Sequence, residues 1–121
     1  MSNPRRILVV EDDFSIRETI HMALESEGYE VVTAVNGRDG LDKIETEGGF
    51  SLVLLDLVMP IMGGLEFLSH LRENPKHAEL PVLMVSATAD EVSSQRADGF
   101  LRKPIDLETL LKIVPIYARE V

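Results

Sequence analysis

The stretch LVLLDLVMPIMGG, residues 52–64, begins with four consecutive apolar residues and then presents one carboxylate, Asp56, ahead of a turn that contains proline and glycine. An apolar run without polar alternation is typical of a strand that is covered on both faces of a parallel sheet. Asp56 is therefore expected to emerge from a buried strand directly at the edge of the sheet. This stretch predicts both a core element and a candidate functional residue.

The rest of the chain repeats this pattern and predicts an α/β domain. Four further apolar runs are expected to be strands, the last of them weaker: residues 7–10, 31–34, 82–85 and 99–101. Apolar residues at helical spacing follow these runs: Ile16, Ile20, Ala23 and Leu24; Leu41 and Ile44; Leu65, Leu68 and Leu71; Leu107, Leu110, Leu111 and Val114. Gly28 is expected to stop the first helix, while Asn36 and Asp106 are expected to cap later ones. The alternation predicts a flavodoxin-like, doubly wound five-stranded parallel sheet of the (βα)5 pattern.

Two places depart from a regular (βα)5 pattern. Residues 87–98 contain almost no large apolar side chain, so the fourth helix is expected to be short, distorted or missing. Pro115 lies inside the last amphipathic stretch, where proline removes a backbone donor and clashes with the preceding turn. We therefore expect the last helix to end or kink near Val114.

Length and composition limit the classes of function. A chain of 121 residues, 45% hydrophobic and 27% charged, is sufficient for a single domain that spans residues 1–121. The formal net charge of −9 disfavours direct binding to nucleic acid, which is a polyanion. The chain has no cysteine and no apolar run of membrane-spanning length, so we expect a cytoplasmic protein without a membrane segment.

Polar residues gather where the predicted strands end: Glu11, Asp12 and Asp13, then Asp56, Ser86 and Lys103. The carboxyl ends of parallel strands meet at one edge of the sheet, so these side chains are expected to converge. Clustered carboxylates repel each other and favour a hard divalent cation, above all Mg²⁺. Asp56 could then attack a phosphoryl group, with Lys103 and Ser86 contacting the phosphoryl oxygens.

Four strings at these strand ends resemble the landmarks of response-regulator receiver domains, the phosphorylation switches of two-component signalling: RRILVVEDDFSIRE (5–18), LVLLDLVMPIMGG (52–64), VLMVSA (82–87) and GFLRKPI (99–105). The resemblance spans nearly the whole chain. It implies that Asp56 is the phosphoacceptor. It also implies that Asp12, Asp56 and the backbone carbonyl of Val58 ligate Mg²⁺, with Glu11 acting through water.

The same resemblance implies a switch made of Ser86 and Phe100, a phosphate-pairing role for Lys103, and a cis peptide between Lys103 and Pro104. A histidine kinase or histidine phosphotransfer protein would donate the phosphoryl group. A downstream protein or output domain would respond to the changed conformation. The chain is thus expected to be a signalling receiver that transfers and hydrolyses its own phosphoryl group, and not a conventional enzyme.

The sequence also differs from typical receivers. Only sixteen residues, 87–102, separate Ser86 from Lys103, which is several fewer than usual, so the surface that normally reports phosphorylation is expected to be altered. Val58 and Thr88 occupy positions expected to contact the attacking water, and neither offers a charged or amide group to orient it. We therefore expect slow self-dephosphorylation.

Three alternatives stay open at this point. A pseudo-receiver or scaffold would keep the fold and bind partners without phosphorylation. A flavodoxin-type electron carrier would share the topology, although the carboxylates of residues 11–13 would repel the FMN phosphate. A haloacid-dehalogenase-like phosphatase would need a second aspartate where Val58 stands.

Several residues near the motifs have simpler explanations. Asp13 is expected to be a helix cap or a solvated loop residue, and Phe100 is also compatible with plain core packing. His21, His70 and His77 have no second ligand at metal-binding spacing, so we expect them at the surface.

Overall fold

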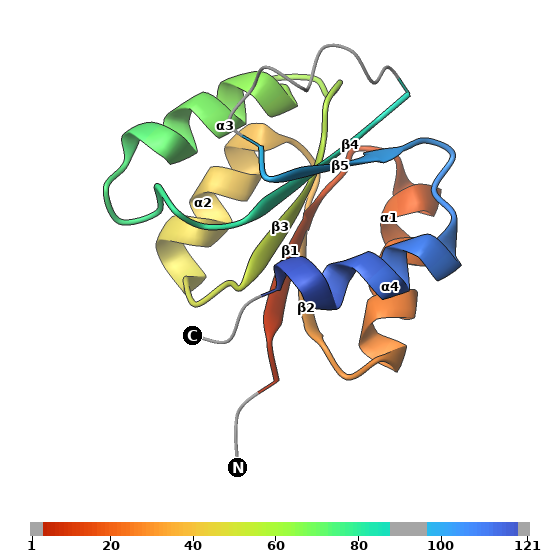
Figure 1. Ribbon diagram of the computed structural model, residues 1–121. Coiled ribbons are helices and arrows are strands. Elements are labelled where there is room, and N and C mark those ends of the chain that lie inside the picture. The colour runs from red at the N-terminus through yellow and green to blue at the C-terminus, as the bar shows by residue number, and fades with distance from the viewer. Residues whose placement is uncertain (1–3, 88–96, 119–121) are drawn as a thin grey trace.

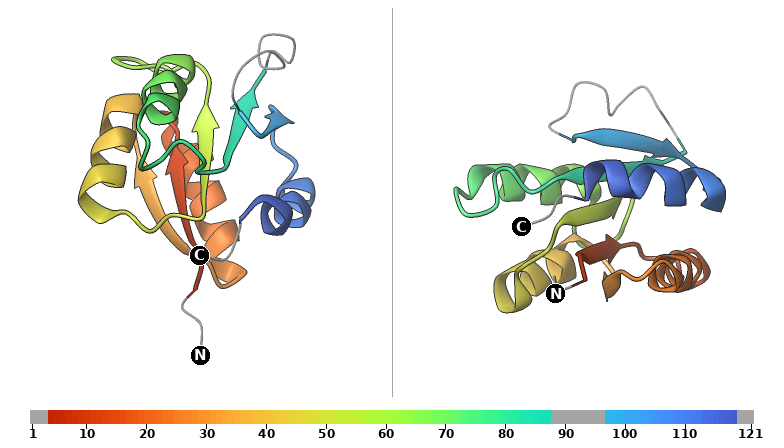
Figure 2. Two further views of the ribbon diagram at one scale, coloured as in Figure 1. Left: turned by 60° about the vertical axis from the view of Figure 1, so that its left-hand side comes forward. Right: turned by 60° about the horizontal axis from the view of Figure 1, so that its bottom comes forward.

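The computed structural model describes residues 4–87 and 97–118, in which a parallel sheet lies between two pairs of helices (Figures 1 and 2). The elements follow in the order β1 (Arg6–Val10), α1 (Phe14–Ser26), β2 (Glu30–Ala34), α2 (Gly37–Glu47), β3 (Leu52–Asp56), α3 (Gly64–Glu73), β4 (Val82–Ser86), β5 (Gly99–Arg102) and α4 (Leu107–Tyr117). The strands are arranged as β2-β1-β3-β4-β5, and every neighbouring pair is parallel. The predicted flavodoxin-like sheet is confirmed.

The apolar runs form strands because alternate residues of each run pack on opposite faces of the sheet. One set packs against α2 and α3: Leu8, Val10, Val53, Leu55, Val82 and Met84. The alternate set packs against α1 and α4: Ile7, Val9, Leu52, Leu54, Leu83 and Val85. Figure 1 shows these two helix pairs on opposite sides of the sheet. Helices on both faces explain why the runs lack polar alternation.

The strand register determines which residues lie together at the carboxyl edge of the sheet. Strands β1 and β3 pair in register, so Glu11, which follows β1, and Asp56, which ends β3, reach the edge at the same level. Ser86 ends β4 opposite Arg102 of β5, and Lys103 comes next in the chain. Parallel pairing therefore carries acidic, hydroxyl and basic side chains to one edge.

The predicted caps fix the helix ends. The side-chain oxygen of Asn36 accepts the Asp39 amide at 2.8 Å at the start of α2. Gly28 follows α1 with a φ of 93°, a region that glycine enters without steric strain. Asp106 occupies the cap position of α4, where its carboxylate accepts the Thr109 hydroxyl at 2.6 Å. The boundary predictions for Asn36 and Gly28 are confirmed, and Asp106 stands at the predicted cap position without a side-chain hydrogen bond to a backbone amide.

Two expectations about helices are wrong in detail. On α3, Leu68 and Leu71 are buried as expected, but Phe67 shares the core face with them and Leu65 is 38% exposed. Helix α4 continues past Pro115 to Tyr117, so it does not end near Val114, while the alternative of a kink there stays a prediction. Pro115 is exposed, so its ring faces solvent and the helix loses one backbone hydrogen bond without losing its packing.

The expected short or missing fourth helix falls on residues 88–96, which lie outside the described residues and include Thr88. The label α4 therefore belongs to the C-terminal helix. None of the helices in residues 4–87 and 97–118 is long and apolar enough to cross a membrane.

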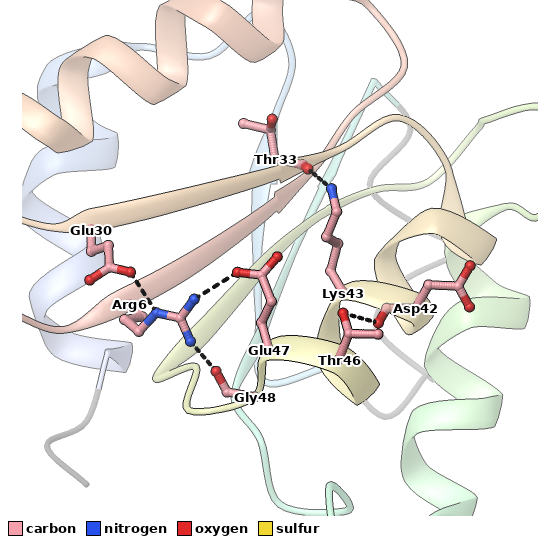
Figure 3. A network of polar contacts seen from close by, with 8 residues as sticks. All are labelled: Arg6, Glu30, Thr33, Asp42, Lys43, Thr46, Glu47 and Gly48. Atoms are coloured by element: carbon pink, nitrogen blue, oxygen red, sulfur yellow. Dashed lines mark hydrogen bonds and ion pairs between the residues drawn. The ribbon is translucent and has the colours of Figure 1, made fainter.

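The amino edge of the sheet is braced by Arg6, whose guanidinium links three segments of the chain (Figure 3). Its Nε lies 2.9 Å from the Glu30 carboxylate and its Nη2 lies 3.0 Å from the Glu47 carboxylate. Its Nη1 donates to the carbonyl of Gly48. The guanidinium also lies over the Phe50 ring, 4.6 Å from the centroid. Arg6 thereby ties β1 to β2 and to the end of α2.

A second arginine, Arg72 of α3, holds the segments that enter β4 and β5. It donates to the carbonyls of Ala78 and Leu80 at 3.1 and 2.7 Å, and its Nη2 lies 2.9 Å from the carboxylate of Asp98. The same Asp98 oxygen accepts the Val82 amide at 2.8 Å. The strand entries are therefore fixed by side-chain hydrogen bonds.

Candidate functional site

Three carboxylates converge at the carboxyl edge, as the sequence predicted. Glu11 and Asp12 follow β1 and Asp56 ends β3, and one oxygen from each lies within 4.8 Å of the others. Glu11 and Asp56 are buried, whereas Asp12 is exposed. The cluster is therefore open to solvent on the side of Asp12 and closed on the side of the sheet.

Lys103 lies between the two buried carboxylates. Its Nζ is 3.0 Å from Glu11 Oε1 and 3.0 Å from Asp56 Oδ1, and its side chain is 22% exposed. The backbone holds it there, since its amide donates to the Ser86 carbonyl at 2.9 Å and its peptide to Pro104 is cis, as expected. One lysine thus forms ion pairs with two carboxylates.

Burial changes the acid–base properties of this group. Desolvation raises the pKa of Glu11 to about 7, although hydrogen bonds from the Asp13 amide and Lys103 oppose the rise. Desolvation also raises the pKa of Asp56 above its ordinary value, again opposed by Lys103. Burial lowers the pKa of Lys103, but its hydrogen bonds to Asp56 and Glu11 outweigh that effect and raise it overall. One cation only partly offsets the desolvation of two carboxylates.

Asp13, the third acid in the run, belongs to the helix and not to the cluster. Its carboxylate accepts the Ile16 amide at 2.9 Å and so caps α1. Its own amide donates to Glu11 Oε2 at 3.1 Å. The expectation of a capping role for Asp13 is confirmed.

Three further residues were predicted to belong to this site, and they differ in exposure: Ser86, Phe100 and Val58. Ser86 is buried at the end of β4. Phe100 of β5 is half-buried and packs against the core between the sheet and the α2–α3 pair. Val58, two residues after Asp56, is 77% exposed in the loop between β3 and α3. The structure places these residues, while their roles stay predictions.

The β3–α3 loop contains a feature that the sequence did not reveal. Ile61 has a φ of 69°, and the Met62 amide donates to the Pro60 carbonyl at 2.7 Å, which closes a γ-turn around Ile61. The carbonyl of Met62 in turn accepts the Gly37 amide at 2.9 Å. A β-branched residue gives no sequence signal for positive φ, because it disfavours that conformation.

Gly64 shows why this loop returns so closely to the acceptor. A Cβ at Gly64 would lie 2.4 Å from the Asp56 carbonyl oxygen, closer than real contacts allow. The Gly64 amide also donates to the Leu57 carbonyl at 2.9 Å. Only glycine lets α3 begin directly against the end of β3.

The donor set fits a hard divalent cation. Carboxylate oxygens from two strand ends converge, one of them on an exposed residue, which matches the oxygen ligands and solvent access that Mg²⁺ prefers. The histidines lie elsewhere: within residues 4–87 and 97–118, none of them belongs to a group of three potential metal ligands. A site with soft or imidazole ligands is therefore not supported by these residues.

Comparison of this chain with known proteins identifies a family that agrees with the acidic cluster. A family model, the response regulator receiver domain, matches residues 7–115. The chain belongs to the response regulator receiver family. It is accordingly a signalling module of two-component systems and not a conventional enzyme.

Curated relatives of the receiver include an uncharacterized transcriptional regulatory protein, YkoG, of Bacillus subtilis. It is 40% identical over 110 residues, which cover 87% of this chain and 47% of the relative. The response regulator MprA of Mycolicibacterium vanbaalenii is 40% identical over 114 residues, covering 89% of this chain and 48% of the relative. The receiver therefore spans about half the length of these curated relatives.

Solved structures resemble the receiver over nearly its whole length. The chemotaxis protein CheY4 of Vibrio cholerae has a TM-score of 0.88 and 34% identity, covering 94% of this chain and 98% of that one. The response regulator TrrA of Thermotoga maritima, solved in complex with Mg²⁺-BeF, has a TM-score of 0.83 and 34% identity, covering 93% and 98%.

Proposed function

We propose that this receiver is a phosphorylation switch in which Asp56 accepts a phosphoryl group from a phosphohistidine donor. The observation that carries the proposal is the contact of Lys103 with both buried carboxylates, at 3.0 Å each. A desolvated carboxylate that shares one lysine with a second carboxylate is poorly stabilised as an anion and is suited to attack an electrophile. Lys103 is then in place to pair with an oxygen of the transferred group.

The transfer can be written with bonds and charges balanced. An oxygen of the Asp56 carboxylate forms a bond to phosphorus while the bond between phosphorus and the donor imidazole breaks. The imidazole nitrogen keeps the electron pair, and an acyl phosphate remains on Asp56. Water later attacks phosphorus, which restores the carboxylate and releases inorganic phosphate.

The metal contribution follows from the same residues. We infer that Asp12, Asp56 and the backbone carbonyl of Val58 hold Mg²⁺, with Glu11 acting through a water molecule. When bound, Mg²⁺ would supply charge neutralisation for the phosphoryl oxygens. Asp12 is exposed, and it therefore offers the route by which the cation and the donor approach.

The partners follow from the chemistry of a receiver. The donor is a histidine kinase or a histidine phosphotransfer protein, and the signal passes to a downstream protein or an output domain. The new charge on Asp56 draws the hydroxyl of Ser86 toward the phosphoryl group, and Phe100 changes its packing as Ser86 moves. Phe100 is half-buried, and this supports a role in which its ring is only partly held by the core.

The direct test is phosphorylation by a small phosphodonor. The purified receiver is incubated with Mg²⁺ and acetyl phosphate, and its intact mass is measured. We expect a gain of one phosphoryl group that is absent in Asp56→Asn and when Mg²⁺ is chelated. Asp42→Asn, which changes an exposed aspartate on α2, is the matched control and should retain the gain. An unmodified wild-type protein would instead support the pseudo-receiver alternative.

The lifetime of the phosphorylated form is a second measurement. Val58 is exposed but apolar, and it cannot orient the attacking water by a hydrogen bond. We therefore expect slow loss of the phosphoryl group, and faster loss in Val58→Asn, which supplies an amide. A wild-type lifetime of seconds would contradict this expectation.

A further inference from the structure

Arg17, in the first turns of α1, makes unusual contacts with the acidic run that precedes the helix. Its Nη1 donates to the Glu11 carbonyl at 2.9 Å and lies 3.4 Å from the Asp12 carbonyl, a longer and weaker contact. Its guanidinium lies over the Phe14 ring, 5.4 Å from the centroid. The half-buried cation thus contacts the backbone of the loop.

This choice of partners is informative because Arg17 contacts the backbone of two acidic residues, Glu11 and Asp12, and follows a third, Asp13, by four positions. A surface arginine in such a place is expected to pair with a carboxylate. In the described part of the chain, however, the ion pairs of Glu11 and Asp56 are with Lys103. Arg17 instead donates to backbone carbonyls, which leaves the acidic side chains free to point toward one another.

The two carbonyls belong to the peptide planes on either side of the Asp12 α-carbon. Fixing both planes fixes the backbone dihedral angles of Asp12, and those angles set the direction of its Cα–Cβ bond and favour particular rotamers of its side chain. Asp12 is exposed, so packing does not hold it in place. Glu11 is already oriented by the Asp13 amide and by Lys103. The second of the two planes is also held by the Asp13 amide, which donates to Glu11 Oε2, whereas the first is held by the shorter Arg17 contact. Of the acids in the cluster, Asp12 is therefore the one whose direction depends most on Arg17.

We propose that Arg17 is a positioning residue of the cation site, holding the Glu11–Asp12 backbone so that the Asp12 carboxylate faces Asp56. The inference rests on the proposed function, since it concerns the residues that would hold Mg²⁺. Arg17 itself does not contact the cation. Its effect is to order the loop before the cation arrives, as outer residues do in other metal sites.

A positioning role and a purely electrostatic role predict opposite results. A positive charge near a cation site repels the cation. If charge were the only effect of Arg17, replacing it with a neutral residue would therefore strengthen Mg²⁺ binding. Removing a positioning contact would weaken binding, because the loop must then be ordered during binding. Arg17→Met removes the charge and the contact, whereas Arg17→Lys keeps the charge and removes the forked donor group.

The experiment measures Mg²⁺ affinity by calorimetric titration of the wild type, Arg17→Met, Arg17→Lys, Asp12→Asn and the control Arg38→Met. Arg38 is exposed at the start of α2, on the same edge of the sheet, so its variant removes an equal charge nearby. We expect about tenfold weaker binding in both Arg17 variants, in line with other outer-residue losses. Arg38→Met should bind at least as tightly as the wild type.

Each outcome separates the two levels of the proposal. Wild-type affinity or tighter binding in both Arg17 variants would overturn the positioning role while leaving the cation site intact. If the wild type shows no saturable Mg²⁺ binding, the cation site and this inference are both overturned. Thermal unfolding shows whether each variant is folded, and if Arg17→Met does not fold, the affinity of Arg17→Lys decides.

Discussion

Charged side chains are partnered differently at the two edges of the sheet. At the amino edge, Arg6 and Arg72 each contact several carbonyl or carboxylate groups, as Figure 3 shows for Arg6. At the carboxyl edge, Glu11 and Asp56 are buried and share Lys103. Charges at the amino edge stabilise the fold, whereas those at the carboxyl edge oppose folding and stay available to a ligand.

The backbone at the carboxyl edge also includes a feature that opposes stability. The loop beside Asp56 holds Ile61 at a positive φ, and that side chain is 80% exposed, so strain and an exposed apolar group occur at one residue. Backbone strain of this kind persists where surrounding contacts fix it, and it concentrates near functional sites. The carboxyl edge is thus built at the expense of stability.

The largest effect should come from breaking the amino edge. The side chain of Arg72 is 8% exposed, and Arg72→Met would leave the carbonyls of Ala78 and Leu80 without this donor. We expect the free energy of unfolding to fall by about 3 kcal/mol. Urea denaturation measures the change, with the exposed Arg38→Met as control. An equal response of the two variants would argue against a stabilising amino edge.

The pH dependence of stability should reveal the opposite property of Glu11. Its pKa of about 7 in the folded protein lies above the ordinary carboxyl value, so the folded state holds the proton more tightly. That contribution is complete below about pH 4.5 and is lost as the pH rises through 7. Without Mg²⁺, the wild type should lose roughly 2 kcal/mol relative to Glu11→Gln over this range.

Urea denaturation at a series of pH values, with a chelator present, measures this difference. A wild-type curve that runs parallel to that of Glu11→Gln would show that the buried carboxylate does not oppose folding.

Asp56→Asn should stabilise the metal-free protein. The raised pKa of Asp56 means that its anion is less favourable in the folded state than in water, and Lys103 would keep Glu11 as a partner. We expect a gain of about 1 kcal/mol near neutral pH, measured by urea denaturation. Asp42→Asn should give no comparable gain. Destabilisation by Asp56→Asn would place this carboxylate among the structural charges.

The smallest effect should come from relieving the strained turn. Ile61→Gly removes the steric penalty of positive φ, and little buried surface is lost because the side chain is exposed. We expect a gain of about 0.5 kcal/mol, after the greater flexibility of glycine in the unfolded chain is counted. Ile61→Ala keeps a Cβ at the same φ and should gain less. A loss of stability in Ile61→Gly would mean that the turn is not strained.

The sequence by itself determined the parts of this protein that depend on local pattern. Unbroken apolar runs are buried on both faces, so they had to form a parallel sheet covered by helices. Parallel strands end at a common edge, so the carboxylates at the ends of β1 and β3 had to meet, and a lysine after β5 had to lie near them. Asp56 and its neighbours were predictable for this reason.

Only the tertiary structure decided how these charges are partnered. Nothing local to Lys103 shows that it serves both Glu11 and Asp56, and nothing local to Arg17 shows that it contacts carbonyls. The exposure of Leu65 and the continuation of α4 past Pro115 also depend on which face meets the sheet. Such contacts join segments far apart in sequence, and their geometry is set by packing, which a pattern of residue types does not contain.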